Sequence, residues 1–200
     1  MIRLLYNSLP STFYVAVSGG IDSMVALDFF INGRKNVTVA HFNHGTEFGH
    51  KAEKFVINFC KDKNIPYVLG NIKDDRHPGF SQEEHWRNER HNFFYSLNGY
   101  VVNAHHLDDA VEWWIFSSLH GKGKLIPYSN KNIIRPFLTT SKESIINWSK
   151  NKNVPFMDDP SNKDEKFMRS IIRNKIVPEA LRVNPGLRKV IYKKYKINAD

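Results

Sequence analysis

The stretch FYVAVSGGIDS, residues 13–23, decides the fold of this 200-residue chain. Phe13–Val17 is a short, continuous apolar run, which is typical of a strand buried on both faces. Gly19 and Gly20 then interrupt the run, and apolar residues recur at helical spacing from Asp22 to Phe30. We therefore expect a buried strand that turns tightly into a helix.

The turn itself, Ser18-Gly19-Gly20-Ile21-Asp22-Ser23, has the properties of an anion cradle. Two glycines let several backbone N–H groups point at one place, and the helix adds the positive end of its dipole. Ser18 and Ser23 can donate hydroxyl hydrogen bonds. The turn is not a Walker loop, because Gly-Lys-Ser/Thr is missing.

Asp22 is the informative residue of this turn. A carboxylate inside a phosphate cradle repels its ligand unless a cation such as Mg²⁺ lies between them. The alternative role of Asp22 is to cap the helix. With the whole hexapeptide placed between a strand and a helix, we favour phosphate binding, with Asp22 as the metal ligand.

The rest of the chain continues the alternation of strands and helices. We expect further strands at Asn36–Phe42, Pro66–Gly70, Tyr100–Ala104 and Ile133–Arg135, and further helices at Lys51–Lys63, Ser81–Leu97, Asp108–Leu119, Thr140–Asn151 and Ser170–Leu181, with Tyr192–Asp200 frayed. This pattern predicts an α/β fold with an open, mostly parallel five-stranded sheet and helices on both faces. We divide the chain into a catalytic domain, residues 1–140, and a basic helical C-terminal extension, residues 141–200.

Polar clusters directly follow three of the expected strands, at Ser18–Ser23, His41–His44 and His105–Asp109. Ligands of parallel sheets bind beyond the carboxyl ends of the strands, so these clusters should meet in one site. Asp109 and Glu112 are three residues apart at a helix start and therefore share a face, which suits an ammonium group. A metal site at the His/Asp cluster and simple helix capping by Asp108 stay open as alternatives.

Composition limits the class of protein. The net charge is +9, with eleven Lys or Arg and four Asp or Glu after residue 160, a balance that suits a polyanionic partner. The single cysteine, Cys60, excludes an internal disulfide and a Cys-pair metal site, and we expect it to be a buried core thiol. Met1–Pro10 lacks the apolar run of a signal peptide, and no stretch is long enough to span a membrane, so we expect a cytoplasmic protein.

The ordered motifs resemble those of the PP-loop, or N-type ATP pyrophosphatase, superfamily, and within it the tRNA(Ile)-lysidine synthetase family. The matching positions are the hexapeptide Ser18–Ser23, His41-Phe42-Asn43-His44-Gly45, Glu83 with Arg87 and Arg90, His105-His106-Leu107-Asp108-Asp109-Ala110-Val111-Glu112, Arg135-Pro136-Phe137, Asp159-Pro160-Ser161-Asn162, Arg169, Arg173 and Pro178. The resemblance spans roughly residues 13–185. This chain departs from the family at Ala110, Thr46-Glu47, His91 and Trp86, positions that bear on substrate recognition.

The resemblance implies an adenine nucleotide alpha hydrolase-like fold and a role for each motif. ATP would be bound by Ser18, Gly19, Gly20, Ile21, Asp22, Ser23 and His44, and Mg²⁺ by Asp22. Lysine would be bound by Asp109, Glu112 and His106, and RNA or phosphates by Arg87, Arg90, Arg169 and Arg173. The residues implied as catalytic are Asp22, Asp109 and Arg173.

The implied reaction is ATP-dependent conversion of a tRNA anticodon cytidine to lysidine. The partners would be tRNA, expected to be tRNA(Ile) with a CAU anticodon, and free lysine, with ATP and Mg²⁺ as cofactors. Three alternatives stay open: a PP-loop thiolase of tRNA, an enzyme that amidates or adenylates another acceptor, and a non-catalytic RNA-binding relative. A homodimer also stays open.

Overall fold

The computed structural model describes residues 1–5, 9–73, 79–160 and 168–197. The described residues form an α/β fold built on one sheet, with the strand order β3-β2-β1-β4-β6-β5. Its strands are β1 (Thr12–Ala16), β2 (Asn36–Asn43), β3 (Tyr67–Asn71), β4 (Val101–Val102), β5 (Ser129–Asn130) and β6 (Ile133–Ile134). All neighbouring strands are parallel except β5, which runs antiparallel to β6. The prediction of an open, mostly parallel sheet is therefore confirmed.

The sheet has six strands where the sequence predicts five. The additional strand, β5, is two exposed polar residues long and lies between the helix expected to end at Leu119 and the strand expected to begin at Ile133. Ser129 and Asn130 pair with Ile134 and Ile133 across a tight turn. A strand this short and polar has no hydrophobic alternation, so the sequence pattern contains nothing that indicates it.

The strand order reverses at β1, and this reversal positions the site. The chain moves outward from β1 to β2 and β3, then returns to place β4 on the other side of β1. The segments that follow β1 and β4 therefore start next to each other. The segment after β1 leads toward β2, and the segment after β4 leads to the other side of the sheet. In open parallel sheets such a switch point creates the crevice in which ligands bind.

Helices cover both faces of the sheet, as predicted. The main helices are α1 (Ile21–Asn32), α2 (Glu47–Asp62), α3 (Gln82–Ser96), α4 (Leu107–Leu119) and α5 (Lys142–Lys152), with a 3-10 turn, η1 (Pro136–Thr139). Alternate residues of β1 separate the two faces: Phe13 and Val15 pack in the core beneath α1, while Tyr14 packs with Phe94 of α3. Burial on both faces explains why β1 is a continuous apolar run.

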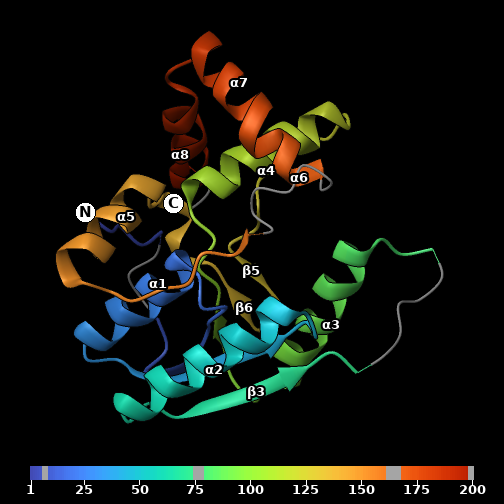
Figure 1. Cartoon of the computed structure of the whole chain (residues 1–200). Helices are drawn as coiled ribbons and strands as arrows, with labels where there is room; N and C mark the ends of the chain where they lie inside the picture. Colours follow the sequence, from blue (N-terminus) through green and yellow to red (C-terminus); the bar gives the residue numbers. More distant parts are fainter. Residues whose placement is uncertain (6–8, 74–78, 161–167, 198–200) are drawn as a thin grey trace.

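The C-terminal segment packs on α4. It consists of α6 (Met168–Ile171), a π-helical turn η3 (Ile172–Ile176), α7 (Val177–Val183) and α8 (Leu187–Ile197). Leu187, Ile191 and Tyr195 of α8 are buried with Leu107 and Val111 of α4. Figure 1 shows α7 and α8 beside α4, on the opposite side of the molecule from α2 and β3.

Two expected helix boundaries are wrong. The helix expected at Lys51 begins at Glu47, because the Thr46 side chain accepts a hydrogen bond from the Gly49 N–H at 2.9 Å and caps it. The segment expected to fray is helical from Tyr192 to Ile197, because Ile191 and Tyr195 bury one face of α8, and residues 198–200 lie outside the described part. Within the described residues, no helix combines the length and apolarity that a membrane span requires.

Candidate active site

The residues Ser18–Ser23, called the phosphate loop below, span the junction between β1 and α1, as the sequence predicts. Gly19 has a φ of +90°, a left-handed backbone conformation that side chains with a Cβ rarely adopt. The Ser23 hydroxyl is buried and donates to the Gly20 carbonyl at 2.9 Å, and it also accepts from the Ser18 N–H at 3.1 Å. Ser23 therefore holds the loop in shape, whereas Ser18 is exposed at the cavity.

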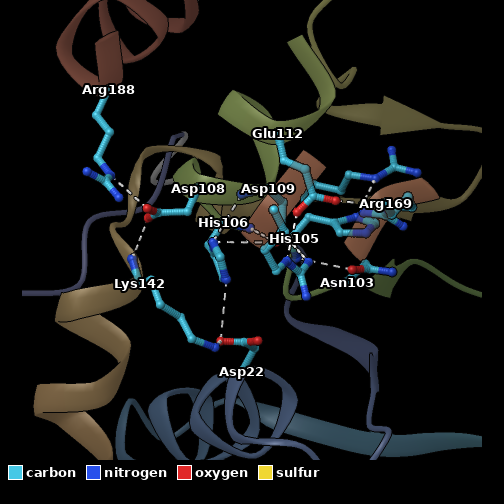
Figure 2. Close-up of polar contacts among 12 residues, drawn as sticks. Asp22, Asn103, His105, His106, Asp108, Asp109, Glu112, Lys142, Arg169 and Arg188 are labelled. Carbon is cyan, nitrogen blue, oxygen red and sulfur yellow. Dashed lines mark hydrogen bonds and ion pairs between the residues drawn. The ribbon is translucent and has the colours of Figure 1, made fainter. Parts of the chain in front are cut away.

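Asp22 extends from the first turn of α1 into the same cavity. Its Oδ1 accepts from the Lys142 ammonium at 2.5 Å, and His106 Nε2 lies 3.5 Å from the same oxygen (Figure 2). Burial alone would raise the pKa of Asp22, but His106 and Lys142 outweigh it and lower the pKa to about 2. Asp22 is therefore an anion at neutral pH, and in this structure its partner is the Lys142 ammonium.

His106 and Asp109 form a reciprocal cap at the start of α4. The Asp109 N–H donates to His106 Nδ1 at 3.4 Å, and the His106 N–H donates to Asp109 Oδ2 at 2.9 Å. With Nδ1 accepting, the neutral ring donates through Nε2 toward Asp22. Burial would lower the pKa of His106, but the Asp109 and Asp22 carboxylates raise it above its usual value.

Capping by Asp108, the alternative raised from the sequence, is wrong for α4. Asp108 Oδ2 instead accepts from the Lys142 N–H at 2.8 Å, and Oδ1 accepts from Arg188 Nε at 2.7 Å. Asp108 therefore joins the first turn of α4 to the first turn of α5 and to α8. Figure 2 shows Arg188 and Lys142 converging on it from two sides.

Glu112 is held by two arginines of the C-terminal segment. Its side chain is only 5% exposed, and its two oxygens accept from Arg169 Nε at 3.0 Å and from Arg173 Nε at 2.8 Å. Arg173 also lies 3.4 Å from Asp109 Oδ1. Burial would lower the pKa of Arg173, but Glu112 and Asp109 raise it above its usual value. The expected pair of acids is thus present on one face of α4, with guanidinium groups against it.

A second wall of the cavity comes from the end of β2 and from α3. Arg90 donates from Nη1 to His44 Nε2 at 3.4 Å, and the His44 and Trp86 rings lie 5.5 Å apart. Burial, together with the positive charge of Arg90, lowers the pKa of His44 to about 3, so this ring is neutral. Among the described residues, His41 Nε2, His44 Nδ1 and Arg90 Nε are buried without a hydrogen-bond partner, and water or a ligand is needed to satisfy such groups.

These walls enclose a cavity of about 1070 Å³, large enough for a nucleotide. Of the residues expected to bind ligands, the cavity is lined by Ser18, Gly20, Ile21, Asp22, Ser23, His44, Arg90, Asp109, Arg169 and Arg173. Gly19, His106 and Glu112 lie behind this lining, and Arg87 is exposed elsewhere on α3. Ser161 and Asn162 of the expected C-terminal motif lie outside the described residues.

Sequence reasoning missed Lys142 and the structural role of Asp108. Lys142 approaches the phosphate loop from a helix 120 residues further along the chain, and no local pattern reveals such a partner. Trp86 was noted only as a departure from the family, yet it lies on the cavity wall.

The donor set of the cavity fits Mg²⁺ bound jointly by the protein and a nucleotide. Within the described chain, no group of three or more His, Cys, Asp or Glu could hold a metal without other ligands, so the alternative of a metal site at the His/Asp cluster has no support. Asp22, an ionised carboxylate beside the phosphate loop, suits an ion that takes one carboxylate together with phosphate oxygens and water.

The comparisons with known proteins agree with this geometry. The PP-loop domain family matches residues 2–180. The tRNA(Ile)-lysidine synthase of Lactiplantibacillus plantarum is 32% identical over 200 residues, covering 91% of this chain and 45% of that protein. The enzyme of the same name from Thermotoga maritima is 31% identical over 199 residues, covering 90% and 47%. The chain therefore spans about half the length of these curated relatives.

A solved structure shows the same fold. The U34-tRNA thiolase NcsA from Methanococcus maripaludis superposes with a TM-score of 0.75 at 17% identity, covering 98% of this chain and 73% of that one. At this identity the likeness concerns the fold alone. The glycine-turn phosphate loop between β1 and α1, the reversal of strand order beside it and the match over residues 2–180 lead to one conclusion: this chain belongs to the PP-loop domain family.

Proposed function

We propose that this chain carries the ATP-dependent ligase activity of a tRNA(Ile)-lysidine synthase, joining lysine to a cytidine of a tRNA anticodon. The observation that carries the proposal is one cavity that has the phosphate loop on one side and the Asp109 carboxylate, with its arginines, on another. The names of the curated relatives, which align over nine tenths of this chain, support the same activity.

The nucleotide would bind with its phosphates on the loop. The backbone N–H groups around Gly20 and the N-terminus of α1 favour anionic oxygens. Asp22 would hold Mg²⁺, which when bound offsets charge on the pyrophosphate leaving group. Arg169 and Arg173, each nearly half exposed, add positive charge at the far side of the cavity.

The reaction requires two displacements. The C2 oxygen of cytosine attacks the α-phosphorus of ATP, and pyrophosphate leaves. The lysine amine then attacks C2, the C2–oxygen bond breaks, and AMP leaves with that oxygen. Each step is favoured when the reacting groups are held in one water-poor cavity.

In this proposal Asp109 acts on the amine. A lysine amine has a pKa of about 10.4 and is protonated at neutral pH, so it must lose a proton before it attacks. Asp109 lines the cavity, and its pKa lies below the usual value because the two neighbouring histidines outweigh the opposing effect of burial. This carboxylate can hold the ammonium group and accept its proton as the C–N bond forms.

Two of the alternatives have less support. A thiolase that carries an iron–sulfur cluster on protein cysteines needs several of them, and the only cysteine of the chain, Cys60, is buried on α2 away from the cavity. A non-catalytic relative would not need to retain an ionised Asp22 beside an open phosphate loop. An enzyme that adenylates another acceptor uses the same loop, and the choice of amine and acceptor separates it from the proposal.

The test is an incubation with ATP, Mg²⁺ and labelled lysine, with and without tRNA carrying a CAU anticodon. The proposal predicts lysine transfer that requires the tRNA, with one AMP and one pyrophosphate released for each lysine. Asp22→Ala should abolish pyrophosphate release. Turnover with ammonia or another acceptor in place of lysine and tRNA would support the adenylating alternative, and a lack of ATP turnover would contradict both.

A further inference from the structure

Lys142 lies in the first turn of α5, and two contacts fix its position. The Ser141 side chain caps α5 by accepting from the Ser144 N–H at 3.2 Å, and the Lys142 N–H donates to Asp108 at 2.8 Å. From this fixed base the side chain crosses to α1 and reaches Asp22 (Figure 2). About one third of it is exposed, and it lines the cavity.

The partner of Lys142 distinguishes it from the arginines that line the cavity. Arg169 and Arg173 contact Glu112, and Arg90 contacts His44. The Lys142 ammonium instead contacts the carboxylate that the proposed function assigns to Mg²⁺, at Oδ1 of Asp22. The lysine therefore occupies the position that a metal would take on that oxygen.

Mg²⁺ and the ammonium cannot share this oxygen. Mg²⁺ binds carboxylate oxygens at about 2.0–2.1 Å and keeps a near-ideal octahedral shell, so a second cation at hydrogen-bonding distance would be crowded and repelled. When the metal takes this oxygen, Lys142 must leave it. The phosphate loop, Ser18–Ser23, lines the same cavity, so the oxygens of a bound nucleotide offer new anions to a flexible lysine.

We infer that Lys142 is a phosphate-binding residue that exchanges Asp22 for the nucleotide: it neutralises the carboxylate in the empty site and binds the phosphates once Mg²⁺ has taken its place. This inference rests on the proposed use of ATP. It also explains how the loop tolerates Asp22 before the metal arrives, because the carboxylate is never left unpaired beside the incoming anion.

The exchange predicts that Lys142→Gln raises the affinity for the metal ion and lowers the affinity for ATP. Without the competing ammonium, Mn²⁺ alone, used as a probe for Mg²⁺ and followed by electron paramagnetic resonance, should bind about two- to fivefold more tightly, the range for a partly exposed ion pair. ATP at saturating Mg²⁺ should bind about tenfold more weakly, as expected when a charged hydrogen bond to phosphate is lost. Lys142→Arg keeps a cation and should retain most of the ATP affinity.

Lys150→Gln is the matched control, because Lys150 is exposed on the last turn of the same helix and should change neither affinity. Thermal unfolding establishes that each variant folds, and Lys142→Met provides a second neutral variant. Weaker binding of both Mn²⁺ and ATP, or unchanged ATP binding, in the neutral Lys142 variants would overturn the exchange. Failure of the wild-type chain to bind ATP would instead overturn the proposed function, and the inference with it.

Discussion

Replacing Glu112 by glutamine should loosen the C-terminal segment from α4. The carboxylate is 5% exposed and accepts one charge-assisted hydrogen bond from Arg169 and one from Arg173, at 3.0 and 2.8 Å. An amide of the same shape has one oxygen and one NH₂ group. Glu112→Gln can therefore accept from one arginine, but it turns a donor toward the other.

The expected cost follows from the one bond that is lost. A hydrogen bond to a charged group contributes about 1.5–3 kcal/mol, and because the arginines are nearly half exposed water replaces part of it, so we expect a loss of about 2 kcal/mol. For a chain of this size that corresponds to a fall in Tm of about 4–8 °C. The assay is thermal unfolding followed by circular dichroism.

The matched control is Glu179→Gln on α7. Glu179 pairs with Arg182 three residues later, but both side chains are largely exposed, so the change should cost about 0.3–0.5 kcal/mol and lower Tm by less than about 2 °C. A Glu112→Gln variant that unfolds at the wild-type temperature, or no lower than Glu179→Gln, would refute the view that this carboxylate anchors the C-terminal segment.

The amine-binding carboxylate, the phosphate loop and the buried thiol each carry a separate prediction. Asp109→Asn should leave the Kd for ATP unchanged and raise the KM for lysine about tenfold or more, and equal effects on both ligands in binding and kinetic assays would contradict it. Gly19→Ala forces a Cβ into a backbone with φ of +90° and should lower the free energy of unfolding by about 1–2 kcal/mol, whereas Gly20→Ala, where a Cβ meets only Ser18 at 3.6 Å, should not; denaturant titrations compare them. Burial raises the pKa of Cys60 to about 11, so the thiol stays protonated at pH 8 and should resist iodoacetamide until the chain unfolds; rapid alkylation of the folded protein, seen by mass spectrometry, would count against this burial.

Local features of the fold could be predicted where a physical constraint determines which residue types a segment can contain. The run Phe13–Val17 is apolar because both faces of β1 are covered, and Gly19 is glycine because the turn needs a positive φ. Thr46-Glu47, noted only as a departure from the family, proved to be a helix start, since Thr46 caps α2 and Glu47 pairs with Lys51. A threonine directly before a helix is a common cap, so the residue type at position 46 is itself the signal for that start.

Long-range partners could not be predicted. The expectation that the polar clusters after β1, β2 and β4 meet in one site is consistent with the cavity, which residues of all three clusters line. Nothing in the sequence indicated that Lys142 reaches Asp22. Nor did it indicate that His106 caps α4 while Asp108 accepts a hydrogen bond from the first turn of α5. These contacts depend on how helices far apart in the chain pack, and hydrophobic periodicity does not encode them.

The most direct test of the account is a crystal structure of the protein with Mg²⁺ and a non-hydrolysable ATP analogue. The account predicts phosphate oxygens within hydrogen-bonding distance of the backbone N–H groups of Ser18–Ser23, Mg²⁺ on Asp22, and the Lys142 ammonium on a phosphate instead of on the carboxylate. A nucleotide bound elsewhere, with the loop empty and Lys142 still on Asp22, would contradict it.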